Sequence, residues 1–312
     1  MGRTARIRTA VKSVLWWPVL LVLRWSDRKV GAILLYHDVG DRDGDVQREL
    51  VPPISRAQLA RQFQFLRRHC RLVSLVDIQA AATARRRGES FPVAITFDDD
   101  LGHHVTHALP ELRAVDASAT FFLCGSFLDR PRDFWWQRLQ RAVDSGANVT
   151  PLVGVGSISE QGQVMEALAP DRRDAAAAAL EELAGPAPDS ELLTAEGARR
   201  LPHIGFHTIR HDQLPRLDDE QLVRALTDGR AGLGEVAGYP IDTIAYPHGR
   251  FDSRVVEAAR RQGFSIGVTC ERHAVTPDAD PLALGRYEPQ IGASIGEFAF
   301  GLIRTLATYP RS

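Results

Sequence analysis

Seven short apolar runs recur along the chain, and most of them end in a polar or charged cluster. Each run is too short for a helix and is rich in β-branched or aromatic residues, as buried parallel strands are. The runs are residues 31–39, 91–100, 118–126, 203–208, 242–249, 265–271 and 282–289. We therefore predict that these segments are the strands of one parallel sheet.

Segments with helical periodicity separate these runs. Residues 55–70 begin at Ser55, a favourable N-cap. Residues 251–264 have Asp252 or Ser253 as a candidate N-cap and reach a stop signal at Gly263. Residues 217–233 show a similar helical pattern. Strands that alternate with helices predict an α/β fold with a parallel sheet, and about seven such units predict an incomplete (β/α) barrel.

One region does not follow the alternation. Residues 127–200 contain only helical patterns, and we interpret them as a helical insertion within a domain of residues 30–312. Trp135 and Trp136 stand near the start of this insertion. They could stack on a sugar ring, but aromatic residues in a helix more often pack in a core.

The composition is that of a soluble globular protein, with 312 residues, of which 44% are hydrophobic and 25% charged. A net charge of −1 and a pI near 6.8 argue against a nucleic-acid partner. Cys70, Cys124 and Cys270 are widely spaced. They predict neither a disulfide framework nor a zinc knuckle, and they favour a reducing compartment.

The basic charge is concentrated at the N-terminus. Residues 1–29 hold seven Lys and Arg against one acidic residue, Asp27. Within them, the apolar run from Val14 to Leu23 is interrupted by Pro18 and is too short to span a bilayer, which needs about 20 residues. Tryptophan beside arginine suits a membrane interface. We expect residues 1–29 to attach to a membrane surface, on its cytoplasmic face; the alternative is a helix packed on the domain.

Candidate chemistry gathers where the predicted strands end, and a barrel brings these ends to one rim. Three adjacent carboxylates are stable only if water, a proton or a cation lies among them. Two histidines four residues apart can point the same way if a helical turn begins there, and with an Asp they suit Zn²⁺ or a similar ion. The residues concerned are His37, Asp38, Asp98, Asp99, Asp100, His207, His211, Tyr246, Pro247, His248 and Arg286. The pattern predicts a metal site; the alternative is a pair of surface histidines near an unrelated acidic turn.

Three segments closely resemble, in order, the signatures of the polysaccharide deacetylase family, also known as the NodB homology fold or carbohydrate esterase family 4. They are AITFDDD (94–100), GFHTIRHDQL (205–214) and IAYPHGRFDSRV (244–255). The resemblance covers roughly residues 31–290. It implies a distorted (β/α)₇ barrel and the metal-dependent hydrolysis of an N-acetyl group on a sugar.

The resemblance also implies roles for individual residues. Asp99, His207 and His211 would hold a divalent metal, with Zn²⁺ expected and Co²⁺, Ni²⁺ or Fe²⁺ as alternatives. Asp98 would be the general base that takes a proton from the attacking water. The backbone N–H of His248 would help to stabilise the oxyanion; relatives commonly have tyrosine at this position.

Other positions depart from the family pattern. Asp100 replaces the usual glycine, and its charge could repel the base and raise the pKa of that base. Ala245 stands where many relatives have the arginine that orients the base; Arg286 could replace it or form only a structural salt bridge. No histidine stands near Arg286, where many relatives have their general acid. His37 is therefore expected in that role, with Asp38 either structural or holding the imidazole in its charged form.

We expect a metal-dependent deacetylase that acts on an N-acetylated saccharide, either a polysaccharide or a lipid-linked saccharide. The alternatives are a glycan-binding protein of the same fold without turnover, and an amidohydrolase that acts on a small non-sugar amide. Three histidines that follow the aspartates, His103, His104 and His107, are expected to be solvated. The alternative is that His103 or His104 lines the substrate cleft.

Overall fold

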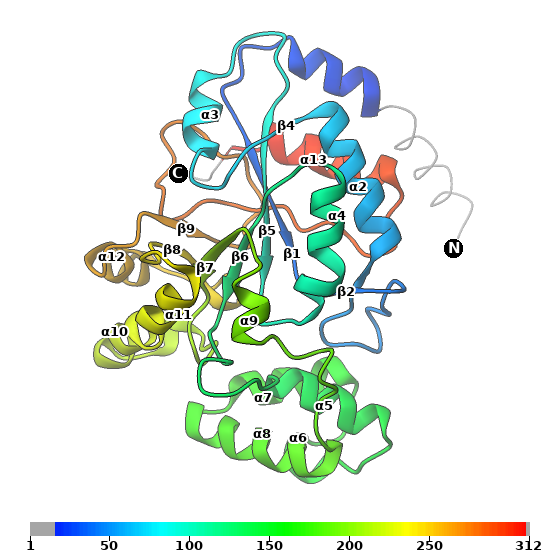
Figure 1. The fold of residues 1–312 in the computed structure, drawn as a ribbon, viewed down its shortest axis with the longest axis vertical. Helices are drawn as coiled ribbons and strands as arrows, with labels where there is room; N and C mark the ends of the chain where they lie inside the picture. The colour runs from blue at the N-terminus through cyan, green and yellow to red at the C-terminus, as the bar shows by residue number, and fades with distance from the viewer. Residues whose placement is uncertain (1–15, 310–312) are drawn as a thin grey trace.

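The computed structural model describes residues 16–309 and shows a parallel sheet enclosed by helices (Figure 1). The sheet has the order β1-β5-β6-β7-β8-β9, and each neighbouring pair is parallel. Its strands are β1 (Ala32–Tyr36), β5 (Pro92–Asp98), β6 (Thr120–Leu123), β7 (His203–Phe206), β8 (Thr243–Ala245) and β9 (Ile266–Val268). Every residue of β1 and β5 is buried, which explains why these runs are apolar without alternation.

The seventh predicted run lies between the first and the last strand of this sheet. Leu284 forms a parallel bridge with Val268 of β9, and Tyr287 forms one with Leu34 of β1. The Tyr287 N–H donates to the carbonyl oxygen of Ile33 over 2.8 Å. Residues 282–289 thus close the sheet, and the prediction of a distorted (β/α)₇ barrel is confirmed.

The remaining elements surround this sheet, and two sequence signals for helix starts are seen. Ser55 and Asp252 each accept a hydrogen bond from a backbone N–H in the first turn of their helix. The pattern predicted over residues 217–233 is two helices, because Gly229 takes a left-handed conformation between them. One more strand, β4 (Arg71–Leu72), belongs to the main sheet itself and pairs with β5 in parallel. The surrounding elements are β2 (Val39–Gly40), β3 (Ile54–Ser55), α2 (Arg56–His69), α3 (Ile78–Ala84), a π-helical turn (His104–Ala108), α4 (Leu109–Ala114), α10 (Asp219–Thr227), α11 (Arg230–Ala237), α12 (Ser253–Arg261), α13 (Ile295–Ala307) and two 3₁₀ turns (Leu214–Arg216, Pro247–Gly249).

The insertion between β6 and β7 is helical, as predicted. It contains α5 (Trp135–Asp144), α6 (Thr150–Val153), α7 (Ile158–Ala167), α8 (Pro170–Ala184) and α9 (Ala195–Ala198). Helices α5 to α8 enclose an apolar cluster of their own, which includes Leu139, Met165 and Leu180. They form a layer against one end of the barrel, at the bottom of Figure 1.

Residues 16–24 are helical, and two different faces of this helix are apolar. On one face the Trp16 ring lies 5.1 Å from the ring of Phe65 in α2, and Leu20 is buried in the main core. The other face exposes 54% of Trp17 and 73% of Val22. Within residues 16–309, no helix is both long enough and apolar enough to cross a membrane. Val14 and Leu15, which begin the predicted apolar run, lie outside the described residues.

Candidate active site and metal centre

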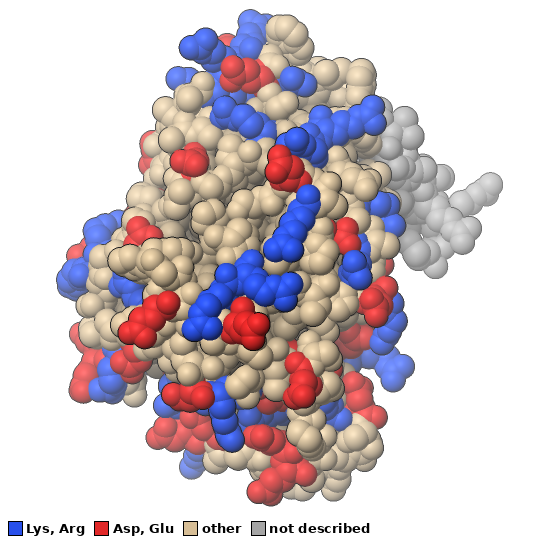
Figure 2. Space-filling model, in the orientation of Figure 1, with Lys and Arg blue, Asp and Glu red and all other residues tan. Residues whose placement is uncertain are grey.

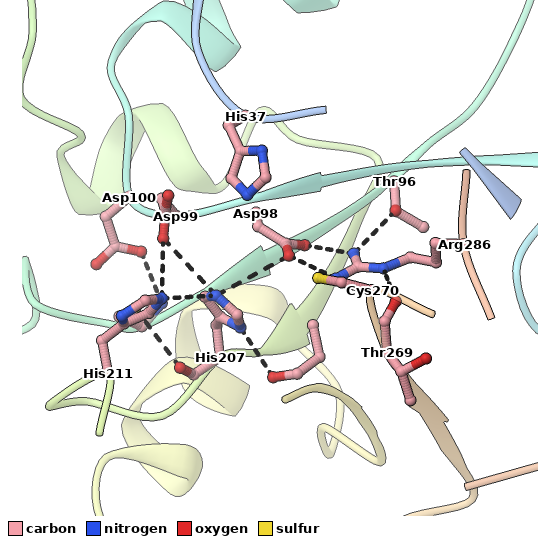
Figure 3. A network of polar contacts seen from close by, with 12 residues as sticks. His37, Thr96, Asp98, Asp99, Asp100, His207, His211, Thr269, Cys270 and Arg286 are labelled. Atoms are coloured by element: carbon pink, nitrogen blue, oxygen red, sulfur yellow. Dashed lines mark hydrogen bonds and ion pairs between the residues drawn. The ribbon is translucent and has the colours of Figure 1, made fainter. Parts of the chain in front are cut away.

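The three consecutive aspartates point to three different sets of partners (Figure 3). Asp98 is the last residue of β5, and Asp99 turns the chain with φ 76°. Asp100 points away from the metal candidates: it accepts hydrogen bonds from the backbone N–H groups of Cys124 and Ser126, over 2.8 and 2.7 Å, and from the Ser126 hydroxyl. Adjacent carboxylates are tolerated here because each has its own environment.

Asp99, His207 and His211 come together as a candidate metal centre. Asp99 Oδ1 lies 3.7 Å from His207 Nε2 and 3.6 Å from His211 Nε2. The two Nε2 atoms are 3.1 Å apart, and all three residues are buried. Thr208 and His211 have φ values of 59° and 50°, so a left-handed turn, rather than the helical turn considered from the sequence, brings the second histidine back.

The donor atoms of this centre fit a divalent cation. His207 Nδ1–H donates to the carbonyl oxygen of Ala245 over 2.8 Å, which leaves the Nε2 lone pair free for a ligand bond. Asp99 Oδ1 is buried and has no hydrogen-bond partner among the described residues. Two imidazole nitrogens and one carboxylate oxygen form the donor set of a catalytic zinc site with open positions.

The pKa shifts of these three residues also favour metal binding. Burial lowers the pKa of His207 to about 4, although the charge of Asp98 opposes this, and burial also lowers the pKa of His211 well below its ordinary value. Burial raises the pKa of Asp99 to about 7, and the charges of Asp98 and Asp100 add to the rise, whereas His37 opposes it. Both imidazoles are thus neutral, as metal ligands must be, and Asp99 lacks a compensating positive charge.

Asp98 is held by Arg286. The guanidinium donates to both carboxylate oxygens, over 2.7 Å each, and both side chains are buried. Burial alone would raise the pKa of Asp98, but Arg286 outweighs it and lowers the pKa to about 2. The expectation that Asp100 would raise the pKa of the base is therefore wrong, because Asp100 is turned away and Arg286 dominates. Of the two roles considered for Arg286, the bidentate contact favours the one in which Arg286 orients Asp98.

His37 has an acidic partner, Glu288, that was not predicted from the sequence. Its Nδ1 lies 3.3 Å from Glu288 Oε1. Asp38, for which the sequence left open a structural role or a contact with His37, lies instead 2.8 Å from His103 Nδ1. Burial opposes the charged imidazole, but Glu288 and Asp99 outweigh it and raise the pKa of His37 to about 9. Solvent screens part of this effect, because the His37 side chain is 29% exposed. Glu288 stands two residues after Arg286 in an extended segment, so period-two alternation was the available signal.

His248 lies at the edge of the metal centre. Its ring centroid is 4.4 Å from that of His211, and its Nδ1 is 3.5 Å from Glu166 Oε1 of α7. The residue has φ 56°, within the 3₁₀ turn that follows β8. The oxyanion role expected for its backbone N–H stays a prediction.

His104 is not solvated, in contrast to the expectation. Its side chain is buried against the rings of Phe97 and Phe121, at 5.4 and 5.2 Å, because the π-helical turn directs it toward the sheet. Its Nε2 lies 3.2 Å from the carbonyl oxygen of His37, and burial lowers its pKa to about 4. Neither His103 nor His104 lines the cavity over the metal candidates, which is described next.

A cavity of about 460 Å³ opens over these groups, within the usual range for ligand pockets of about 300–1,000 Å³. The acidic and histidine side chains at the barrel rim line one part of the cavity, and residues of the helical insertion line another part. The polar and aromatic lining residues include His37, Asp98, Asp99, His207, His211, His248, Glu288, Trp135, Trp136, Gln163 and Glu166. Both tryptophans therefore reach the cavity, although Trp136 is largely buried, with its ring 4.9 Å from that of His211.

Comparison with known proteins identifies relatives of one kind. A family model described as polysaccharide deacetylase matches residues 85–150 and 178–267. A protein of Bacillus subtilis (strain 168), a polysaccharide deacetylase by name (YxkH), is 29% identical over 110 residues, which are 34% of this chain. The match spans only 39% of the length of that relative.

Several solved structures share the fold. Streptococcus pyogenes deacetylase PplD, determined in complex with acetate, has a TM-score of 0.57 and 17% identity, and the match covers 89% of this chain and 98% of that one. A de-N-acetylase from Aggregatibacter actinomycetemcomitans has a TM-score of 0.56 and 16% identity, with coverage of 82% and 94%. IcaB from Ammonifex degensii has a TM-score of 0.54 and 19% identity, with coverage of 88% and 97%.

Proposed function

This chain belongs to the polysaccharide deacetylase family, and from that premise we propose that it is a metal-dependent N-deacetylase of an amino sugar in a polysaccharide or lipid-linked saccharide. Beyond family membership, one observation supports a metal-dependent hydrolysis. The ligand atoms of Asp99, His207 and His211 lie within 4.8 Å of one another, beside a carboxylate that Arg286 holds, in one cavity.

Asp99, His207 and His211 would hold the metal, with Zn²⁺ proposed and Co²⁺, Ni²⁺ or Fe²⁺ as alternatives. When bound, a divalent cation supplies Lewis-acid polarisation of the acetyl carbonyl group. Two arginine N–H donors keep Asp98 ionised and fix its orientation. Asp98 then takes the proton of the attacking water as general base.

Departure of the sugar nitrogen requires a proton donor. His37 lines the same cavity as Asp98, and the neighbouring Glu288 favours its charged form. Protonated His37 gives its Nε2 proton to the departing amine as the C–N bond breaks, and acetate is the second product. The backbone N–H of His248 is the proposed donor to the developing oxyanion.

Acetate release from N-acetylated chito-oligosaccharides, with added Zn²⁺ or Co²⁺, tests this function. Wild-type protein should release acetate, and an Asp98→Asn variant should bind the metal but release far less. Tight saccharide binding without acetate would instead favour a non-catalytic glycan-binding protein. Acetate from small non-sugar amides alone would favour an amidohydrolase.

We also propose that the N-terminal helix attaches the enzyme to the cytoplasmic face of a membrane. Its outward face exposes Trp17 and Val22, and Trp25, directly after the helix, is also exposed. The seven basic residues among residues 1–29 complement anionic headgroups. The protein should sediment with vesicles that contain anionic lipid and less with neutral vesicles. Val22→Asp should reduce sedimentation, whereas Val155→Asp, at a 91% exposed valine of the insertion, should not. Equal sedimentation of the two variants would reject this attachment.

A further inference from the structure

Part of the substrate cavity is lined by a segment that lies between the two ranges matched by the family model. The family model leaves residues 151–177 unmatched, and these residues include all of α7. From α7, Ser159, Gly162, Gln163 and Glu166 line the cavity. Their contacts with a substrate would therefore lie outside the part of the chain that the family model matches.

Helix α7 is a firm support for these side chains. Ser157 and Glu160 form a capping box at its start, and Met165 is fully buried in the core of the insertion. Gly162 lies so close to Leu50 that a Cβ there would come within 2.6 Å of the leucine side chain. The helix is thus packed on both sides, and Glu166 has a defined position at the cavity.

The charged residues that line the cavity are acidic, apart from histidines. Its lining contains no Lys or Arg among the described residues, but it contains five carboxylates: Asp38, Asp98, Asp99, Glu166 and Glu288. Three of these carboxylates form ion pairs: Asp38 with His103, Asp98 with Arg286, and Glu288 with His37. A fourth, Asp99, belongs to the candidate metal centre. Glu166 has only the contact with His248, and it forms no ion pair with a Lys or Arg of the described chain.

The surroundings of Glu166 add to this polarity. Residues 127–200 contain twelve Asp and Glu against eight Arg, a net charge of −4. In Figure 2, acidic side chains are prominent around the lower end of the molecule, where Figure 1 places the insertion. Such a field favours the approach of cations and opposes that of anions.

We propose that Glu166 and Trp135 form a subsite for a sugar residue with a free, protonated amine, next to the N-acetylated residue that reacts. The proposal rests on the deacetylase function and specifies its substrate: a partly deacetylated amino-sugar chain is preferred, and anionic saccharides are disfavoured. The half-buried Trp135 side chain supplies an aromatic surface for a sugar face. The carboxylate of Glu166, whose side chain is 38% exposed, accepts hydrogen bonds from the ammonium group. Because deacetylation itself creates this amine, reaction at one residue promotes reaction at its neighbour.

The test compares two tetrasaccharides, fully N-acetylated chitotetraose and the same tetramer with one free amine beside an acetylated residue. Wild-type protein should show a kcat/KM roughly five- to tenfold higher for the amine-containing tetramer at low salt, mainly through KM. High salt should reduce that ratio. Glu166→Gln should bring the ratio close to one, and the control Glu182→Gln, at an exposed position of α8, should keep the wild-type ratio.

Each outcome is decisive. Equal or reversed kcat/KM values for the two tetramers in wild-type protein would overturn the subsite and leave the deacetylase function intact. A Glu166→Gln variant with the wild-type ratio would overturn the assignment to Glu166. If no acetate appears from either tetramer, the proposed function fails, and calorimetric binding of the fully deacetylated tetramer still tests the subsite. Wild-type protein should then bind that tetramer more tightly than Glu166→Gln, and equal affinities would overturn the proposal.

Discussion

Arg173 of the insertion should control how firmly the turn that carries the candidate metal ligand His211 is held. Its guanidinium pairs with Asp212, the residue directly after His211, and also lies 3.3 Å from the carbonyl oxygen of Arg210. Both side chains of the pair are almost fully buried, with 5% and 8% exposure. Replacing Arg173 with methionine keeps the apolar stem but leaves the Asp212 carboxylate without its main partner.

The size of the effect follows from these contacts. Removing one partner of a buried ion pair costs about 3–5 kcal/mol. Arg210 Nε lies 3.7 Å from Asp212 Oδ2 and compensates in part, although its side chain is 44% exposed and its contribution is screened. We expect Arg173→Met to lower the free energy of unfolding by roughly 2–4 kcal/mol. The looser turn should also weaken Zn²⁺ binding by about 10- to 100-fold, the usual effect of losing a group that orients a metal ligand.

Two measurements on metal-free protein check this: urea unfolding, and calorimetric titration with Zn²⁺. Arg85→Met is the matched control. Arg85 is 3% exposed and donates to the carbonyl oxygens of Arg24 and Arg28, away from the metal centre, so its loss should reduce stability without changing Zn²⁺ affinity. Adding Asp212→Asn to Arg173→Met should restore part of the stability, because it removes the buried charge. Wild-type Zn²⁺ affinity in the destabilised Arg173→Met variant would refute the positioning role.

Three further predictions concern single histidines. His211→Ala should lose most of its bound metal, measured by atomic absorption, while circular dichroism shows an intact fold; unchanged metal content would reject the ligand assignment. His37→Ala should bind metal like the wild type yet lose roughly 10²–10⁴-fold in turnover, the usual range for a general acid, and wild-type turnover would exclude it from the reaction. His104 is buried with its pKa lowered from 6.5 to about 4, so between these pH values the unfolded chain binds the proton that the folded chain does not. Stability should therefore fall as the pH drops from about 6.5 to 4, and His104→Phe should make that decline in urea midpoints shallower; an equally steep decline in the variant would contradict the assignment.

Much of the barrel was predictable because its signals are local. A buried parallel strand needs an unbroken apolar run, as in Ile33 to Tyr36, and a helix start needs a side-chain acceptor such as Ser55 or Asp252. The metal candidates were predictable for a similar reason. Their spacing and order along the chain resemble family signatures, and the barrel brings strand ends to one rim.

Only the tertiary structure decided which charged groups meet. Arg286 and Asp98 are 188 residues apart in sequence, and they pair because residues 282–289 close the barrel beside β1. The same closure brings Glu288 to His37. Asp100 turned away from the metal centre because the backbone after β6 offers it N–H donors. Local sequence patterns specify periodicity, turns and caps, whereas contacts between distant segments depend on how the sheet closes and how the insertion packs on its rim.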